Sequence, residues 1–282
     1  MTDNKKYKGE KKDEWFVLTA LISRRLAYPL AVLFCRLGIS ANAVTIMGGL
    51  SWVLSAPAMI LAGWMFGQGN SSAAYWFLGT SLLLVNLGYI LDVADGSVAR
   101  MTGSSSSAGY FLDYVFHLVF HPMYFCSIGI FLYLISGWIG YLVIGVLSIC
   151  SGWGVSFSAK EHVLCEHVAK NSIDLSNFSD DDRYRFFVDS AATRQTVTEK
   201  RNFRKLCTAL IKELLLFPGQ YTTFSIVIIV DLILSRFTSV DFILLKIMFM
   251  GLAVITTLRV PFRIRREYMT LVDYDEFRKR GT

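Results

Sequence analysis

Long stretches without a charged residue alternate along the chain with shorter polar segments. Three of these stretches, 45–66, 73–91 and 138–158, contain no Asp, Glu, Lys or Arg. Each is close to the roughly 20 residues that an α-helix needs to cross the hydrocarbon core of a bilayer. The pattern therefore predicts a transmembrane helix in each.

Three further apolar stretches contain only a few polar residues. They cover residues 110–135, 221–235 and 242–258. Ionisable residues are tolerated inside a span when they face other helices or water. Repeated alternation of apolar and polar residues, which would indicate a barrel, is absent. The chain is thus predicted to be an all-α polytopic membrane protein with six transmembrane helices.

Composition supports this class. Apolar residues make up 54% of the 282 residues, and charged residues make up 18%, against about 25% in soluble domains. The five cysteines form no close pair, so neither a disulfide framework nor a zinc cluster is predicted. The first thirteen residues are mostly polar and do not resemble a cleaved signal peptide.

Lys and Arg residues gather in the segments that would lie on one side of the membrane. Eight fall in 5–36, ten in 160–212 and seven in 259–280, whereas the three opposite loops contain only Arg236. By the positive-inside rule the basic side is cytoplasmic, so both termini are predicted there. Anionic lipid headgroups are the expected partner of these basic clusters, and no nucleic acid is needed to explain them.

The spans divide the chain into five parts. These are a cytoplasmic tail and interfacial helix (1–40), four spans (41–159), a polar cytoplasmic insertion (160–218), two spans (219–260) and a cytoplasmic tail (261–282). Residues 15–37 mix apolar side chains with arginines, which predicts an amphipathic helix at the membrane interface, broken near Pro29. The insertion is either a solvated connection or a cap that faces the substrate.

Acidic residues recur at helical spacing at the predicted cytoplasmic end of the second span. Asp92 and Asp95 are three residues apart, so they share one helix face, and Asp113 begins the third span after a short loop. Three carboxylates from two helices provide the oxygen ligands that divalent cations prefer beside phosphates, and Arg100 offers a planar fork to phosphate oxygens. The alternative is an interfacial cap with Arg100 as an anchor.

The pattern Asp95-Gly96-x2-Ala99-Arg100-x8-Gly109-x3-Asp113, preceded by Asp92, resembles the signature of the CDP-alcohol phosphatidyltransferases. The six-span plan and the segment Asn42-Ala43-Val44-Thr45 are also similar to that family, with Ala41 where proline is usual. The charged insertion 160–218 lies outside the resemblance.

The resemblance implies a role for each matching residue. Asp92, Asp95 and Asp113 would bind divalent ions, usually Mg²⁺ or Mn²⁺. The residues implied for the CDP moiety are Asn42, Thr45, Gly96, Ala99, Arg100, Ser106 and Gly109. An acceptor alcohol would attack the β-phosphorus of a CDP-alcohol such as CDP-diacylglycerol, and CMP would leave. The resemblance also implies a homodimer, which is common in the family.

The chain departs from the family at the last motif position, where His117 replaces the fourth Asp. His117 is either the general base, a metal ligand that makes Zn²⁺ possible, or a relic in an altered enzyme. His121, one turn later, is expected to be a core or interfacial histidine. The main hypothesis is therefore a transferase of lipid synthesis with His117 as the catalytic residue. A nucleotide- or lipid-binding scaffold is the alternative, and a transporter is disfavoured because the charges cluster at one face.

Overall fold

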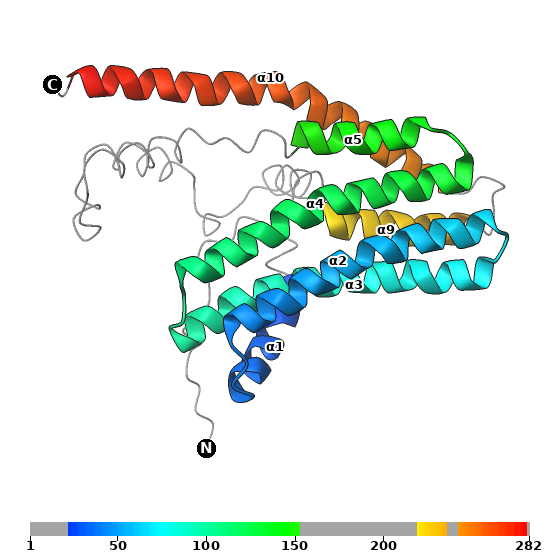
Figure 1. The fold of residues 1–282 in the computed structure, drawn as a ribbon, viewed down its shortest axis with the longest axis horizontal. Helices are drawn as coiled ribbons and strands as arrows, with labels where there is room; N and C mark the ends of the chain where they lie inside the picture. The colour runs from blue at the N-terminus through cyan, green and yellow to red at the C-terminus, as the bar shows by residue number, and fades with distance from the viewer. Residues whose placement is uncertain (1–21, 153–218, 236–241, 281–282) are drawn as a thin grey trace, which may run out of the picture.

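The computed structural model describes residues 22–152, 219–235 and 242–280, and this part of the chain is helical, without a β-strand. Figure 1 shows the helices as an elongated bundle. They are α1 (Arg24–Arg36), α2 (Ala41–Gly67), α3 (Ser71–Thr102), α4 (Ser107–Ser136), α5 (Gly140–Gly152), α9 (Gly219–Leu234) and α10 (Ile243–Arg280). The predicted all-α class is confirmed for these residues. The predicted insertion 160–218 lies outside them.

Four helices are long and apolar enough to cross a membrane. The qualifying segments are Ala41–Gly67, Ser71–Thr102, Phe111–Ser136 and Ile243–Met269. Each of the six predicted spans overlaps one helix of the structure, but α5 and α9 are shorter apolar helices. The structure thus supports an integral membrane protein with four candidate spans, and the count of six stays a prediction.

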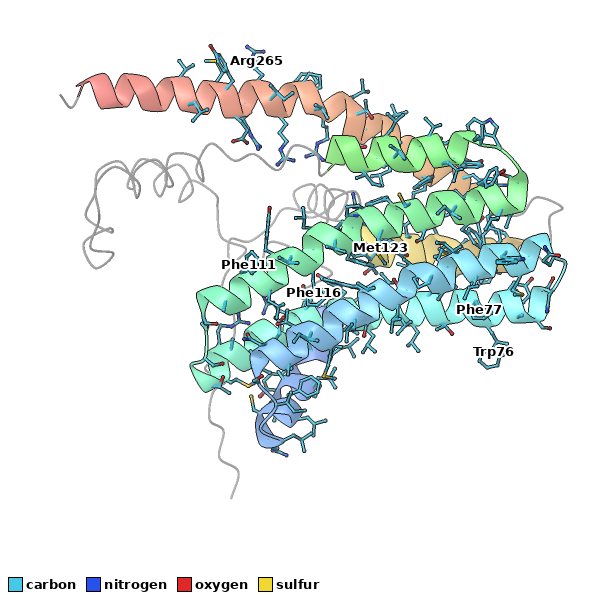
Figure 2. All side chains as sticks on the ribbon, viewed as in Figure 1. Trp76, Phe77, Phe111, Phe116, Met123 and Arg265 are labelled. Atoms are coloured by element: carbon cyan, nitrogen blue, oxygen red, sulfur yellow. The ribbon has the colours of Figure 1, made fainter. Side chains whose placement is uncertain are left out.

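Large apolar side chains cover the outer surface of the bundle. Trp76 on α3 is 80% exposed and points away from the helices, as Figure 2 shows. Phe111 on α4 and Leu83 on α3 are exposed to a similar degree. A soluble protein rarely exposes apolar surface so extensively. This surface fits a hydrocarbon surrounding.

Side-chain caps and glycines set the ends of the helices. Ser40, Asn70 and Ser106 each accept a hydrogen bond from the backbone N–H three residues ahead, at the starts of α2, α3 and α4. Gly103 and Gly137 follow α3 and α4 in the left-handed conformation, with φ of 68° and 71°. Only residues 103–106 separate α3 from α4, so the two helices form a tight hairpin.

Small residues let α2, α3 and α4 approach closely. Trp52 of α2 lies directly over Gly88 of α3, and Phe116 of α4 lies over Gly49 of α2; a Cβ atom at either glycine would overlap the aromatic ring. Trp52 is 1% exposed and donates its indole N–H to the Val85 carbonyl. Without a hydrophobic force between helices in lipid, such close packing is a main source of association.

Helix α1 packs against the last turns of α3. Its buried residues Ala27, Ala31 and Phe34 form one apolar cluster with Ala94 and Val98 of α3. The predicted break at Pro29 is wrong, because α1 continues through Pro29 as one helix. Pro29 lies on the exposed side of α1, where its missing hydrogen bond is offset by packing of the opposite face on α3. The interfacial position of this helix stays a prediction.

Helices α9 and α10 are joined by a buried carboxylate. Asp231 of α9 is 2% exposed, and its two oxygens accept hydrogen bonds from the backbone N–H groups of Leu244 and Leu245, at 3.0 and 2.7 Å. These N–H groups belong to the first turn of α10 and have no partner within that helix. Asp231 therefore serves as a helix cap.

Candidate active site

The start of α2, the end of α3 and the start of α4 meet at one end of the bundle, where α1 also lies (Figure 1). The motif residues 92–100 occupy the last turns of α3. The tight hairpin between α3 and α4 brings Asp113 and His117 opposite Asp92. Side chains far apart in sequence thus share one space.

Asp92, Asp113 and His117 form a cluster of possible metal ligands. The Nε2 atom of His117 lies 3.1 Å from Oδ1 of Asp92 and 3.1 Å from Oδ1 of Asp113. One donor atom from each of the three residues lies within 4.8 Å of the others. The side chains are part-buried, with exposures of 19%, 38% and 16% for Asp92, Asp113 and His117. Two carboxylates and one imidazole are a suitable donor set for a divalent cation.

Asp95 lies outside this cluster, although the resemblance grouped it with Asp92 and Asp113. Its Oδ2 atom accepts a hydrogen bond of 2.6 Å from the hydroxyl of Thr45 on α2. The Thr45 side chain is buried, so this contact holds the Asp95 carboxylate against α2. The structure therefore brings two of the three predicted acidic ligands together with His117 and places the third beside Thr45.

Arg100 folds back along α3 toward Gly96. Its Nη2 atom donates to Ser97 Oγ at 3.2 Å, and a Cβ atom at Gly96 would lie 3.1 Å from its Nη1 atom. Gly96 thus leaves room for the guanidinium in this rotamer. Arg100 is exposed, so it lies at the surface of the protein. Ala99 is partly buried and packs against the apolar cluster of α1 and α3.

Asn42, Ser106 and Gly109 meet where α2 approaches the start of α4. A Cβ atom at Gly109 would lie 2.9 Å from Asn42 Oδ1 and 3.3 Å from Ser106 Oγ. Ser106 accepts the Gly109 N–H at 3.1 Å. The absence of a side chain at Gly109 therefore keeps this polar corner open, and all three residues were predicted to belong to one site.

An aromatic group forms the floor beneath the cluster. The Trp52 ring lies 4.9 Å from His117 and stacks on Phe120 at the same separation. Further down, His121 contacts Tyr221 of α9. Sequence reasoning gave no role to Trp52 or Tyr221, since an aromatic residue inside an apolar span carries no motif signal.

Comparison with protein families gives one match. The model of the CDP-alcohol phosphatidyltransferase family matches residues 38–171. This segment belongs to that family. The match covers the predicted Asn42–Thr45 entry, the acidic motif and His117, so the resemblance found in the sequence is confirmed. No curated protein and no solved structure matches the chain.

The match of residues 38–171 to the CDP-alcohol phosphatidyltransferase family supports a phosphotransferase reaction in a membrane. Members of this family use divalent metals and bind a CDP-alcohol with an acceptor alcohol. The cluster of Asp92, Asp113 and His117 is chemically suited to such a metal. His117, the position at which the sequence differs from the family motif, is thus one of the possible metal ligands.

Proposed function

We propose that this protein transfers a phosphoryl-linked group, in particular a phosphatidyl group, from a CDP-alcohol to an acceptor alcohol. The observation that carries the proposal is the convergence of Asp92, Asp113 and His117 within the segment that matches the family. Two carboxylates near a membrane are costly unless they are paired, hydrated or bound to a cation. The arrangement suits the binding of a cation next to a diphosphate.

Asp92, Asp113 and His117 would hold a divalent ion, with Mg²⁺ or Mn²⁺ as the expected metal and Zn²⁺ compatible with the imidazole. When bound, such an ion neutralises negative charge on the diphosphate. Because His117 Nε2 faces both carboxylates, we assign His117 as a ligand in preference to a relic. Asp95, oriented by Thr45, is assigned to a second ion or to the substrate hydroxyl.

The remaining residues are assigned to the nucleotide. Arg100 binds phosphate oxygens with its guanidinium, and Asn42, Ser106 and Gly109 line the polar corner where α2 approaches α4. Gly96 keeps this region free of side-chain bulk. Thr45 acts through Asp95. Ala99 supports the helix from the side of α1.

In the proposed reaction an oxygen of the acceptor hydroxyl attacks the β-phosphorus of the CDP-alcohol. A new P–O bond forms, and the bond between this phosphorus and the oxygen bridging to the α-phosphate breaks, so CMP leaves. The hydroxyl proton passes to one of three side chains, those of Asp95, Asp113 and His117. Positioning and charge stabilisation supply most of the catalysis in such phosphoryl transfers.

The test measures CMP release from CDP-diacylglycerol with a pool of acceptor alcohols, by the protein purified in detergent. Mg²⁺, Mn²⁺ and Zn²⁺ are titrated for the wild type, Asp95→Asn, His117→Ala and His117→Asp. We expect metal-dependent release, a loss of at least about 100-fold in Asp95→Asn and His117→Ala, and release by His117→Asp with a stronger preference for Mg²⁺. Asp231→Asn, a buried carboxylate outside the site, is the matched control and should retain activity.

The alternative is an inactive scaffold that binds nucleotide or lipid. It is favoured by the replacement of the last motif Asp by His117. If the wild type binds CDP but releases no CMP with any metal, while His117→Asp gains activity, the scaffold is the correct function. Release that survives His117→Ala would remove His117 from the chemistry but keep the transferase.

We also propose that all six apolar helices cross the membrane and that the active site and both termini face the cytoplasm. The support is the clustering of Lys and Arg in the segments on this side. The same side would receive a water-soluble nucleotide product. Two further features stay predictions, namely the polar cytoplasmic insertion at residues 160–218 and a homodimer.

A further inference from the structure

A row of three parallel rings leads from the acidic cluster into the core. His117 and His121 of α4 stack with centroids 5.4 Å apart and planes 16° from parallel. His121 and Tyr221 of α9 stack at 5.3 Å and 8°. The Tyr221 hydroxyl also lies 3.4 Å from His121 Nε2. Helix α9 therefore reaches the site through Tyr221, a hundred residues after His121.

The two inner rings of this row, those of His121 and Tyr221, are more deeply buried than is usual for polar side chains. His121 and Tyr221 are both 0% exposed. A histidine in an apolar core costs free energy unless its polar atoms are satisfied, and an aliphatic side chain would fill the same volume without that cost. The hydroxyl of Tyr221 faces the imidazole of His121, so a polar contact continues into the protein from the candidate active site.

The row restricts the rotation of the His117 ring. His121 lies against one side of it, and Trp52 contacts it at 4.9 Å with planes 52° apart. Rotation about χ2 would turn Nε2 away from Asp92 and Asp113 and would drive the ring into one of these neighbours. An imidazole is a useful ligand only when one nitrogen keeps its direction, which outer residues usually ensure.

We propose that His121 and Tyr221 are positioning residues that hold the ring of His117 so that Nε2 remains directed at the space between Asp92 and Asp113. This inference rests on the proposed function of the cluster as a metal site. It adds α9 to the catalytic unit, outside the segment 38–171 that matches the family. It also explains why a second histidine follows His117 after one helical turn.

The experiment compares metal binding in the full-length protein purified in detergent. Tyr221→Leu and His121→Leu remove a ring, Tyr221→Phe keeps the ring without the hydroxyl, and Phe224→Leu is the matched control. Phe224 lies one turn after Tyr221 on α9 and is equally buried; it contacts Phe125, Phe249 and Tyr124, and Tyr124 also contacts Tyr221. The readouts are Mn²⁺ affinity by calorimetry, the visible spectrum of bound Co²⁺, and the melting temperature.

We expect Tyr221→Leu and His121→Leu to weaken Mn²⁺ binding by about tenfold or more, within the range seen for residues that orient metal ligands. The Co²⁺ spectrum should change toward that of His117→Ala. Tyr221→Phe should bind nearly as the wild type, because the ring is retained. Phe224→Leu should lower the melting temperature to a similar extent as Tyr221→Leu but leave affinity and spectrum unchanged.

Two results would overturn the inference. One is wild-type Mn²⁺ affinity and Co²⁺ spectrum in both Tyr221→Leu and His121→Leu. The other is an equal loss of affinity in Phe224→Leu, which would mean that any cavity on α9 has this effect. Failure of the proposed metal site looks different, since the wild type itself would then bind neither Mn²⁺ nor Co²⁺.

Discussion

The hydroxyl of Thr45 connects two helices at the candidate active site. It lies 2.6 Å from the Asp95 carboxylate and 3.1 Å from the carbonyl of Ala41. A hydrogen bond to a charged acceptor contributes about 1.5–3 kcal/mol. If Asp95 acts in the reaction, loss of this bond should reduce the rate more than it reduces stability.

We therefore predict that Thr45→Val lowers CMP release by about 10- to 100-fold, the range that corresponds to that free energy. Valine keeps the shape of the side chain but leaves the carboxylate without its partner. Thr80→Val is the control, because the Thr80 hydroxyl is exposed and bonds only to the backbone of its own helix. An equal effect of both substitutions on the rate would contradict the role of Thr45.

Gly88 gives a steric prediction at the same scale. A Cβ atom there would overlap the ring of Trp52, and Trp52 borders His117. Gly88→Ala should lower stability by about 1–3 kcal/mol, as overpacking does, and should reduce activity as the ring moves. Thermal unfolding in detergent provides the measurement. Gly79→Ala on the same helix is the control, since nothing lies near an added Cβ atom there, and its melting temperature should stay close to that of the wild type.

Residue by residue, the candidate site could be predicted where the signal is local. Asp113 and His117 are one helical turn apart in the sequence. The short loop before them indicated that this part of the third span lies close to Asp92. The separation of Asp95 from this group could not be predicted, because it depends on a hydroxyl fifty residues upstream. The position of Tyr221 could not be predicted either, because the packing of α9 on α4 leaves no pattern in the sequence.

The elements themselves were predicted more fully. Apolar length alone indicates a helix, and each predicted span overlaps one helix in the part of the chain that the structure describes. The positions of the helix ends were harder to predict. Helix α10 continues well past the apolar run that ends at residue 258, to Arg280, and α1 continues through Pro29. In both cases the hydropathy of a segment indicates whether its side chains are buried in lipid or protein. It does not indicate where the helical hydrogen bonds of the backbone end.

The cap that Asp231 of α9 forms at the start of α10 leads to a prediction about stability. Removing the carboxylate in Asp231→Ala leaves two buried N–H groups of α10 without their acceptors. We expect a loss of about 1–3 kcal/mol in stability and a smaller loss in Asp231→Asn, which keeps one acceptor oxygen. Thermal unfolding in detergent is the measurement. Equal melting temperatures for the wild type and Asp231→Ala would contradict the capping role.

On the scale of the whole molecule, the two turns of the α2–α3–α4 unit lie at opposite ends. Helix α3 has 32 residues, which at 1.5 Å per residue is about 48 Å, longer than the hydrocarbon core. Its motif end therefore projects toward an interface. Gln68 and Ser104 are exposed in the turns before and after α3.

The proposed topology predicts opposite labelling of these turns. In a cysteine-free background, a membrane-impermeant maleimide should label Gln68→Cys in intact cells, and Ser104→Cys only after the membrane is permeabilised. The reason is that the proposed topology, based on the positive-inside rule, places the turn beside the basic segments in the cytoplasm. Labelling of Ser104→Cys in intact cells would place the active site on the other side.

The packing of α1 behind the motif has a consequence for chimaeras. Leu91, Ala94 and Val98 alternate with the acidic residues along α3 and are buried against α1. A graft of residues 92–113 into another chain would thus transfer half of a helix–helix contact together with the acidic residues. Such a graft would also need helix α1, residues 24–36, to keep the carboxylates of α3 in place. The smallest unit that can be transplanted therefore begins well before Asp92.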